Sequence, residues 1–211
     1  METVKFLIAE LNFNPFFENV IGCNCFLHAC AGGNIEVVKY LINKFPELSN
    51  STTNNQFGAV NGLQLASLFG NLKTVIYLIE FGMDPAVMER NCGLNSFLFA
   101  CTGKITGKME GKVKQHLSHS KIVKYLSSHF PELVNSSTCN GDNGLHLASR
   151  SGNLEIVKFL IDELHFDPTV GGDRGTNSFF QACRPRRTEI VNFFAEKYST
   201  FKNCSVTRCQ I

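Results

Sequence analysis

Apolar residues recur along this chain in pairs of short segments, each with the spacing of one face of an α-helix. The pattern is clearest over residues 143–161, which read NGLHLASRSGNLEIVKFLI. The first segment has an apolar side formed by Leu145, Leu147 and Ala148. Gly152 and Asn153 then interrupt the pattern, because both residue types tolerate the backbone angles of a turn. The second segment has apolar residues at i, i+1, i+4 and i+5, namely Ile156, Val157, Leu160 and Ile161, so the sequence predicts two short helices.

The same pair occurs five times. Each first segment begins at an asparagine: Asn24 (NCFLHAC), Asn61 (NGLQLAS), Asn95 (NSFLFAC), Asn143 (NGLHLAS) and Asn177 (NSFFQAC). The spacings between these starts are 37, 34, 48 and 34 residues. Helices this short are unstable alone in water, and each pair can bury its apolar side only against a neighbouring pair. We therefore expect an all-α protein in which about five helical hairpins stack into an elongated solenoid.

The motif N-G-L-H-L-A-S-x-x-G-N-L-E-I-V-K-F-L-I, at a period near 34, resembles the ankyrin repeat over roughly residues 2–200. In that family a Thr-Pro-Leu-His start caps the first helix, and its His joins neighbouring loops by hydrogen bonds. Only His146 stands at the matching position in this chain, and Asn-Gly, Asn-Ser or Asn-Cys replaces Thr-Pro. Other residues replace the His elsewhere: Leu27, Gln64, Leu98 and Phe180. Asn is a good N-cap, so we expect the first helices to remain capped. Whether hydrogen bonds from His join neighbouring loops in this chain stays open.

The units alternate in type, which indicates duplication of a two-repeat block. The separation is 82 residues both from Asn61 to Asn143 and from Asn95 to Asn177. The N-terminal ETVKFLIAELNFNPFF resembles EIVKFLIDELHFDPTV of the fourth unit, so we expect a half repeat there, with a poorly covered apolar face. The predicted array spans 1–203, with a tail at 201–211 and units near 2–22 (half repeat), 23–59, 60–93, 94–141, 142–175 and 176–200.

The third unit carries a basic insertion, about 103–119, at the turn between its helices. Gly103, Gly107 and Gly111 predict that this segment is flexible. The fifth unit has RPRR at the same turn, so the two features would lie along one edge of the stack with Arg150 between them. The candidate contact residues on this basic edge are Lys104, Lys108, Lys112, Lys114, Arg184, Arg186 and Arg187.

The resemblance to ankyrin repeats implies a non-enzymatic scaffold that binds another protein through its concave helix face and loop tips. The candidates on the first helices are Ala31, Leu68, Phe69, Arg150 and Arg184, and those in the loops are Gln56, Arg90 and Arg174. Local packing of Phe69 over its turn is the simpler alternative for that residue. The alternative function is electrostatic binding of nucleic acid or another phosphate-rich partner along the 103–121 insertion and Arg184–Arg187. Solvated lysines without a binding role explain the same residues, and the absence of interleaved aromatics disfavours nucleic acid.

Composition adds little that is specific. The net charge is +2, and no apolar run is long enough to span a membrane. The N-terminus lacks the order of a signal peptide, so we expect an intracellular monomer, cytoplasmic or nuclear, whose nine cysteines are reduced. The style of the repeats resembles arrays of amoebae, giant DNA viruses and intracellular bacteria, which often act in a host cytoplasm.

We expect neither catalysis, nor a cofactor, nor a metal. The segment GKITGKM departs from a phosphate-binding loop in glycine spacing, and Met109 stands where Ser or Thr is needed. The group Cys23, Cys25, His28 and Cys30 lacks the second matching pair of a zinc site. Cysteine recurs at one helical position in three units, which favours core packing: Cys30, Cys101 and Cys183.

Overall fold

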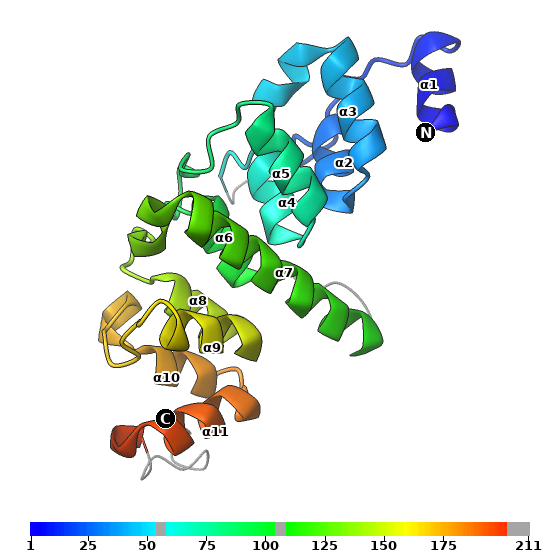
Figure 1. The fold of residues 1–211 in the computed structure, drawn as a ribbon. Helices are drawn as coiled ribbons and strands as arrows, with labels where there is room; N and C mark the ends of the chain where they lie inside the picture. The colour runs from blue at the N-terminus through cyan, green and yellow to red at the C-terminus, as the bar shows by residue number, and fades with distance from the viewer. Residues whose placement is uncertain (54–57, 104–108, 202–211) are drawn as a thin grey trace.

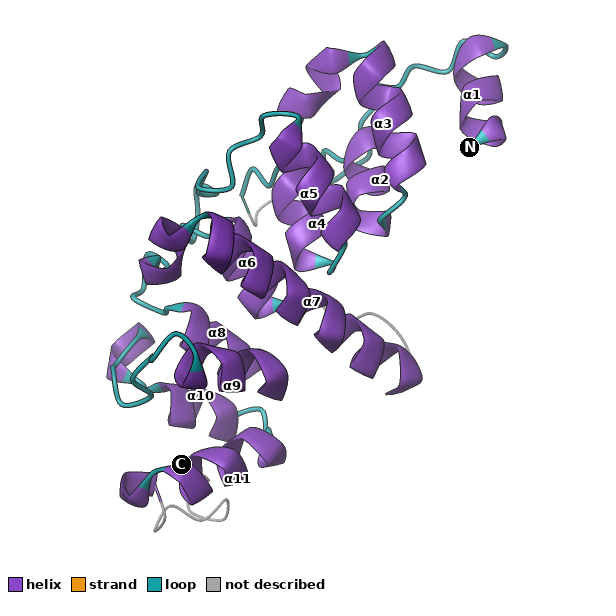
Figure 2. Ribbon diagram, in the orientation of Figure 1, coloured by secondary structure: helices purple, strands orange, loops and turns teal. Residues whose placement is uncertain are grey.

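The computed structural model describes residues 1–53, 58–103 and 109–201, with side chains except at 109–117. Its helices form a curved array that starts with α1 (Glu2–Ala9) (Figures 1 and 2). Five hairpins follow: α2 (Cys25–Gly32) with α3 (Ile35–Lys44), α4 (Gly62–Leu68) with α5 (Leu72–Glu80), α6 (Ser96–Thr102) with α7 (Met109–His129), α8 (Gly144–Ser151) with α9 (Leu154–Asp162), and α10 (Ser178–Cys183) with α11 (Thr188–Lys197). The short 3-10 helices are η1 (Pro46–Asn50), η2 (Pro131–Asn135), η3 (Asp173–Gly175) and η4 (Ser199–Phe201).

All five predicted asparagines cap the first helix of a hairpin. In each case the side-chain oxygen accepts a hydrogen bond from the backbone N–H three residues later, at distances between 2.9 and 3.2 Å. The cap satisfies an N–H that would otherwise lack a partner at the helix start, which stabilises a helix by about 1 kcal/mol. The phase of the five units predicted from the sequence is therefore confirmed, and Asn performs the capping that the family assigns to Thr.

The hairpins stack so that their helices form two rows. The first helices, α2, α4, α6, α8 and α10, pack one against the next and form the inner row. The second helices, α3, α5, α7, α9 and α11, contact one another in the same order and form the outer row. We call each loop that connects one hairpin to the next a finger. Isolated β-bridges close the bases of three fingers, at Thr52–Asn61, Ser137–Asn143 and Gly171–Asn177. The predicted helical-hairpin solenoid is confirmed.

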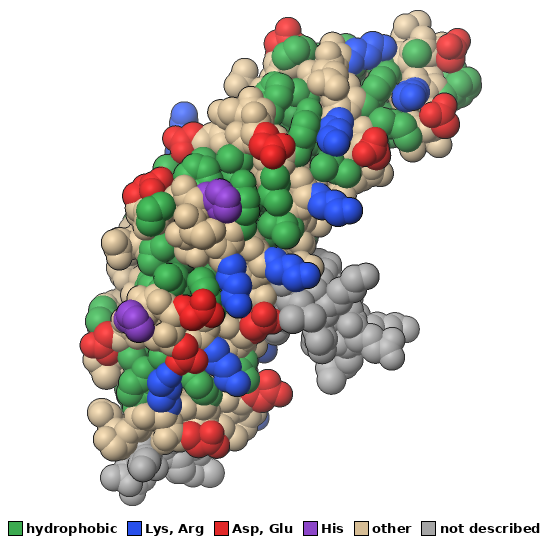
Figure 3. All heavy atoms as spheres, in the orientation of Figure 1, with side chains coloured by type: hydrophobic (Ala, Val, Ile, Leu, Met, Phe, Trp, Pro, Cys, Tyr) green, Lys and Arg blue, Asp and Glu red, His purple; other side chains and the backbone are tan. Residues whose placement is uncertain are grey.

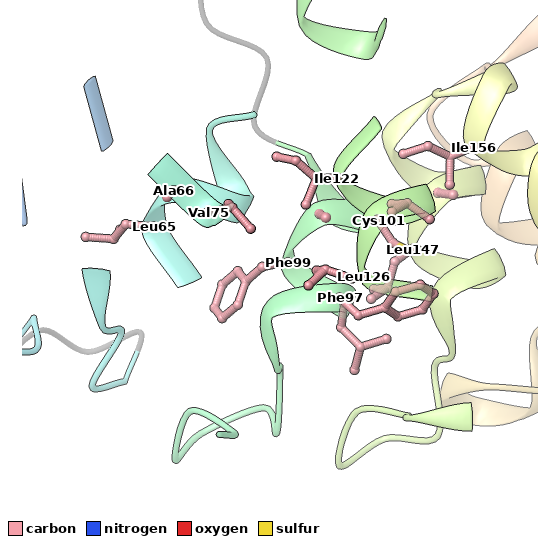
Figure 4. Close-up of a cluster of buried hydrophobic side chains, with 14 of the residues drawn as sticks. Leu65, Ala66, Val75, Phe97, Phe99, Cys101, Ile122, Leu126, Leu147 and Ile156 are labelled. Carbon is pink, nitrogen blue, oxygen red and sulfur yellow. The ribbon is translucent and has the colours of Figure 1, made fainter. Parts of the chain in front are cut away.

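The core runs continuously through the interfaces between units. Figure 4 shows the part between the second and fourth units, where Phe97 and Phe99 of α6 project among side chains of α4, α7 and α8. Phe97 is fully buried, and Leu147 of α8 is 2% exposed. The recurring thiols Cys30, Cys101 and Cys183 are buried in the same core, as predicted.

Glycine at the start of α4 and of α8 allows the preceding inner helix to approach closely. A Cβ at Gly62 would lie 2.8 Å from the Phe26 ring and 3.0 Å from the Cys30 Sγ. A Cβ at Gly144 would lie 3.0 Å from the Phe97 ring and 3.1 Å from the Cys101 Sγ, and Cys101 is equivalent to Cys30. The Phe and Cys of one unit thus occupy the space that the glycine of the next unit leaves.

In three units, a side chain near the start of the packed part of the second helix reaches back to the inner helix of the preceding unit. Asn71 Nδ2 donates to the carbonyl oxygens of Cys30 and Ala31 at 2.9 and 2.8 Å. At the equivalent positions, His119 Nε2, within α7, lies 2.9 Å from the Leu68 carbonyl oxygen, and Arg187 Nε donates to the Arg150 carbonyl oxygen at 3.2 Å. These bonds satisfy carbonyls at the end of an inner helix, which have no partner within the helix. They also fix the register of adjacent units.

The first and third units join the inner helix to their own finger through the capping asparagine. Asn24 Nδ2 donates to Ser51 Oγ at 2.7 Å, and Asn95 Nδ2 donates to Ser136 Oγ at the same distance. Both serines follow a 3-10 helix, η1 or η2. One asparagine side chain therefore caps the helix with its oxygen and holds the finger with its nitrogen.

The second and fourth units use the third helical residue for the same purpose. Gln64 Nε2 donates to the Val87 carbonyl oxygen at 2.8 Å. His146 Nε2 lies 3.0 Å from the Val170 carbonyl oxygen, and its Nδ1 lies 3.2 Å from the backbone nitrogen of Asn143. Because a carbonyl only accepts, Nε2 donates its proton to the Val170 oxygen. The histidine contact left open by the sequence is thus present at His146, and Gln64 reproduces it in the second unit.

The N-terminal half repeat leaves apolar side chains exposed, as predicted. Phe6 is 54% exposed and Leu7 is 37% exposed. In the fourth unit, whose sequence is nearly the same, the equivalent Phe159 is 8% exposed and Leu160 is fully buried. The difference arises because α9 has the neighbours α7, α8 and α11, whereas α1 stands apart from α3 at the end of the array (Figure 1).

The insertion in the third unit extends the outer row. The helix α7 begins at Met109 and continues to His129, so it projects beyond the other outer helices (Figure 1). Gly111, one of the three glycines on which the predicted flexibility of the insertion rests, lies inside α7. The cost of one helical glycine is only about 1 kcal/mol, so a helix that is already anchored at Ile122 and Val123 can extend through it.

We predict that Gly62→Ala destabilises the protein, although alanine is the better helix former by about 1 kcal/mol. The added Cβ would contact the Phe26 ring at 2.8 Å, and the packed interface must shift. The matched control is Gly32→Ala at the end of α2, where a Cβ would meet nothing within 4 Å. Chemical denaturation should give a lower unfolding free energy for the first variant and an unchanged or higher one for the second. Equal effects would contradict the packing of Phe26 against Gly62.

We predict that His146 makes stability depend on pH. Burial lowers the pKa of His146 below its ordinary value, with the Val170 carbonyl opposing this shift. The unfolded chain then binds a proton more readily, so the unfolding free energy should fall as pH drops below about 6.5. In His146→Gln, which copies the residue at Gln64, the donor remains and the titration is lost. Denaturation at about pH 7 and about pH 5 should show a smaller loss of stability for the variant. Parallel losses in both proteins would count against this role.

Candidate partner-binding surface

The ends of the inner helices form a row of equivalent positions, which we call the inner-helix strip. Its members are Ala31, Leu68, Phe69, Thr102, Arg150 and Arg184. Successive inner helices pack side by side, so these residues lie in sequence along one side of the array. The strip changes in character along its length, from apolar in the first two units to cationic in the last two.

The apolar part of the strip is only partly exposed. Leu68 and Phe69 are both half-buried and pack against the core. The alternative that Phe69 packs locally over its turn stays open beside the partner-binding role. Enough of both side chains remains accessible for an apolar contact with another molecule. The sequence-based assignment of these residues to a binding surface stays a prediction.

Arg150 is exposed but paired. Its Nη1 donates to Asp142 Oδ2 at 3.0 Å, and the Asp142 side chain is 4% exposed. The other oxygen of Asp142 accepts from the backbone N–H of Asp173 at 2.9 Å, so this carboxylate joins two fingers. The positive charge that the sequence placed in the middle of a basic edge is thus balanced by a carboxylate beside it.

The RPRR segment of the fifth unit divides into two parts. Arg187 donates to the Arg150 carbonyl oxygen, and its side chain covers Gly152, where a Cβ would approach the Arg187 Cδ to 2.8 Å. Arg187 therefore holds two units together. Arg184 and Arg186 are exposed at the surface, so they are the two members of this segment available to a partner.

The lysines that the sequence assigns to the basic edge lie where the structure describes no side chains. Lys104 and Lys108 lie outside the described residues. Lys112 and Lys114 lie within α7, but their side chains are also outside the described part of the structure. On the face shown in Figure 3, Lys and Arg alternate with Asp and Glu rather than forming one basic area. Two ion pairs on the outer row, Lys124–Glu163 and Lys197–Asp162, contribute to this mixture.

The finger after α5 is held by a buried carboxylate that the sequence analysis missed. Glu89 is 3% exposed and accepts hydrogen bonds from the backbone N–H groups of Asn91 at 2.7 Å and Cys92 at 2.5 Å. Arg90 lies between these anchored residues and is exposed, as Arg174 is in the finger after α9. The candidate Gln56 lies outside the described residues. The signal for Glu89 was weak, since acidic residues in loops are usually exposed.

A groove of about 360 Å³ lies between the loops of the first and second units, and the sequence analysis did not identify it. Phe81, Met83 and Val87 supply its apolar wall, and Ser49 and Asn50 line the opposite side. Phe81 is 42% exposed and Val87 is 46% exposed. The available signal was three apolar residues between the second segment of this unit and the next capping asparagine: Phe81, Met83 and Val87.

Two further features limit the chemistry of the described part of the chain. Across residues 1–53, 58–103 and 109–201, no group of three or more His, Cys, Asp or Glu side chains is arranged to hold a metal ion. Within the same residues, no helix combines the length and hydropathy needed to cross a membrane.

Comparisons with known proteins agree with this architecture. The family model described as "Ankyrin repeats (3 copies)" matches residues 1–89 and 113–206. The interval between the two matches includes most of the basic insertion. A relative among characterised proteins is alpha-latrocrustotoxin-Lt1a of Latrodectus tredecimguttatus, which is 24% identical over 177 residues. The match covers 77% of this chain and 11% of that protein, so the chain spans about a tenth of its relative's length.

Proposed function

This chain belongs to the ankyrin-repeat family, and on that premise we propose that it is a non-enzymatic scaffold that binds another protein through the inner-helix strip and the finger tips. Ankyrin repeats are generally protein–protein interaction modules, and the family is typically non-enzymatic. The observation that carries the proposal is the strip itself, in which equivalent positions of five packed helices differ in chemistry while their buried neighbours keep the same type.

The described contacts support a surface that is formed before the partner arrives. Asn71, His119 and Arg187 fix adjacent units, and Gln64 and His146 fix the fingers. A surface with a fixed backbone loses little conformational entropy on binding, so more of the contact energy appears as affinity. The repeat architecture supplies this rigidity without a ligand.

The residues of the strip suggest the chemistry of the partner. Leu68 and Phe69 offer an apolar contact, and Arg184 offers a cation with no described ion pair. Arg90 and Arg174 place further cations on the fingers. We therefore propose a partner that presents an apolar side chain to the second unit and acidic groups to the fingers and the fifth unit. A monomeric chain acting in the cytoplasm or nucleus is part of the proposal.

We predict that the paired substitutions Phe69→Ala and Arg184→Ala remove partner binding without unfolding the protein. Affinity capture from the native cytoplasm, quantified by mass spectrometry, should show at least about a tenfold loss of the specific partner, since truncation of central contacts typically costs more than 1 kcal/mol each. The matched control is Phe81→Ala with Lys158→Ala, which truncates another exposed Phe and another cation outside the strip. Thermal unfolding verifies that both variants fold. A loss confined to the control pair would place the partner elsewhere, in the groove beside Phe81.

The electrostatic alternative predicts a different response to salt. Binding driven by phosphate contacts weakens steeply as salt rises, because counterions are released from the nucleic acid. Deletion of residues 104–117, which removes the insertion and leaves the buried part of α7, should then reduce the slope of log affinity against log salt. We expect instead a shallow slope and an unchanged affinity in the deletion variant. A steep slope that the deletion lowers would support phosphate binding and contradict the scaffold proposal.

A further inference from the structure

Two exposed thiols lie at the tips of adjacent fingers. Cys92 belongs to the finger after α5, and Cys139 belongs to the finger after η2. They are 47 residues apart in the sequence, but the backbone N–H of Cys139 donates to the carbonyl oxygen of Cys92 at 2.8 Å. The stacking of units therefore brings together two cysteines that no local motif connects.

The hydrogen bond limits the distance between the two Cα atoms. Standard bond lengths place Cα about 1.5 Å from its own nitrogen and about 2.4 Å from its own carbonyl oxygen. With a donor–acceptor distance of 2.8 Å, the two Cα atoms are at most about 6.7 Å apart. Disulfides form at Cα separations of about 4.4 to 6.8 Å, so the backbone meets the upper limit for a disulfide.

The Cys139 thiol lies beside the backbone of the finger that carries Cys92. Cys139 Sγ lies 3.5 Å from the carbonyl oxygen of Asn91, the residue that precedes Cys92. Gly93 follows Cys92, and a Cβ there would lie 3.4 Å from the Cys139 nitrogen. Glu89 holds the backbone of Cys92 in place. The finger after α5 is thus fixed at the point where Cys139 approaches it.

We propose that Cys92 and Cys139 are a redox-active pair, which a disulfide oxidant such as glutathione disulfide converts into a disulfide joining the two fingers. The proposal concerns the reduced protein, whose described cysteines are all free thiols. It does not depend on the proposed function, since it requires no partner.

The reaction proceeds by two thiol–disulfide exchanges. The Cys139 thiolate attacks one sulfur of glutathione disulfide, which forms a mixed disulfide and releases one glutathione. The Cys92 thiolate then attacks the Cys139 sulfur and displaces the second glutathione. The two protein thiols lose two hydrogen atoms in total, and the oxidant is reduced to two molecules of glutathione. Burial, followed by the Glu89 carboxylate, raises the pKa of the Cys92 thiol, so we assign the first attack to Cys139.

The other described thiols have less access to such an oxidant. Cys30, Cys101 and Cys183 are buried in the core. Burial raises the pKa of Cys30 and Cys101, which keeps both as unreactive thiols. Cys23 is also buried, and Cys25 is half-buried with its Sγ 3.2 Å from the Pro15 carbonyl oxygen. Selective oxidation at the finger tips is therefore expected.

The test is oxidation of the reduced full chain in glutathione buffers of increasing oxidising strength. We expect the intact mass to fall by two hydrogen atoms, and non-reducing peptide mapping to recover one cross-linked peptide that contains Cys92 and Cys139. The oxidised protein should also unfold several degrees higher than the reduced one, because the bond restricts the unfolded chain.

Cys92→Ser and Cys139→Ser should each abolish the cross-linked peptide and the thermal shift, whereas Cys25→Ser should retain both. Peptide mapping also reports on Cys204 and Cys209, so their oxidation is not confused with that of the finger pair. A stable mixed disulfide with glutathione on Cys139 and no cross-link would overturn the proposal. A cross-link that joins either finger cysteine to another residue would overturn it equally.

Discussion

Each helical hairpin of this protein depends on a neighbouring hairpin to cover its apolar side. The chain contains its own demonstration, because nearly the same sequence occurs in α1 and in α9. Leu160 is fully buried in α9, and the equivalent Leu7 is 37% exposed in α1. Burying a leucine stabilises a fold by about 1.5–3 kcal/mol, so most of the stability of a unit comes from the units beside it. The same constraint sets the inner helices in a row and so creates the inner-helix strip.

Apolar burial has no direction, so the register of the stack depends on hydrogen bonds at its two edges. At one edge, Asn71, His119 and Arg187 bond to carbonyls of the preceding unit. At the other, side chains from the first helical turns bond to the fingers, as Gln64 does to Val87. Both sets use backbone groups that helix ends and loops leave unsatisfied, so a misplaced unit would leave buried polar groups without partners. The binding surface proposed above includes residues at both edges, the inner-helix strip at the first and the fingers at the second, and takes its fixed shape from these bonds.

Much of this fold followed from the sequence, because capping and apolar spacing are local signals that repeat in phase. The structure of the site followed less well, because it depends on contacts between residues far apart in the chain. Asp142 pairs with Arg150 from a finger and so changes the predicted basic edge. His119 aligns with Asn71, a signal that was present in the sequence, but the insertion before it obscured the alignment. Contacts between fingers could not be predicted at all, since the repeat pattern is weakest where the fingers differ.

The alternation of the units has a physical cause in the way they pack. In the first unit, Phe26 and Cys30 occupy the space that Gly62 leaves at the start of the second. In the third unit, Phe97 packs against Gly144 of the fourth unit in the same way. The inner helix of the third unit itself begins with Ser96, a buried residue that has a Cβ. If two units of the Phe and Cys type were adjacent, a Cβ of the second would lie within about 3 Å of the Phe ring of the first, closer than side chains pack. Two units of the Phe and Cys type therefore do not fit side by side, and a duplication that copies two units together preserves both kinds of interface. The separation of 82 residues between equivalent units is the length of such a block.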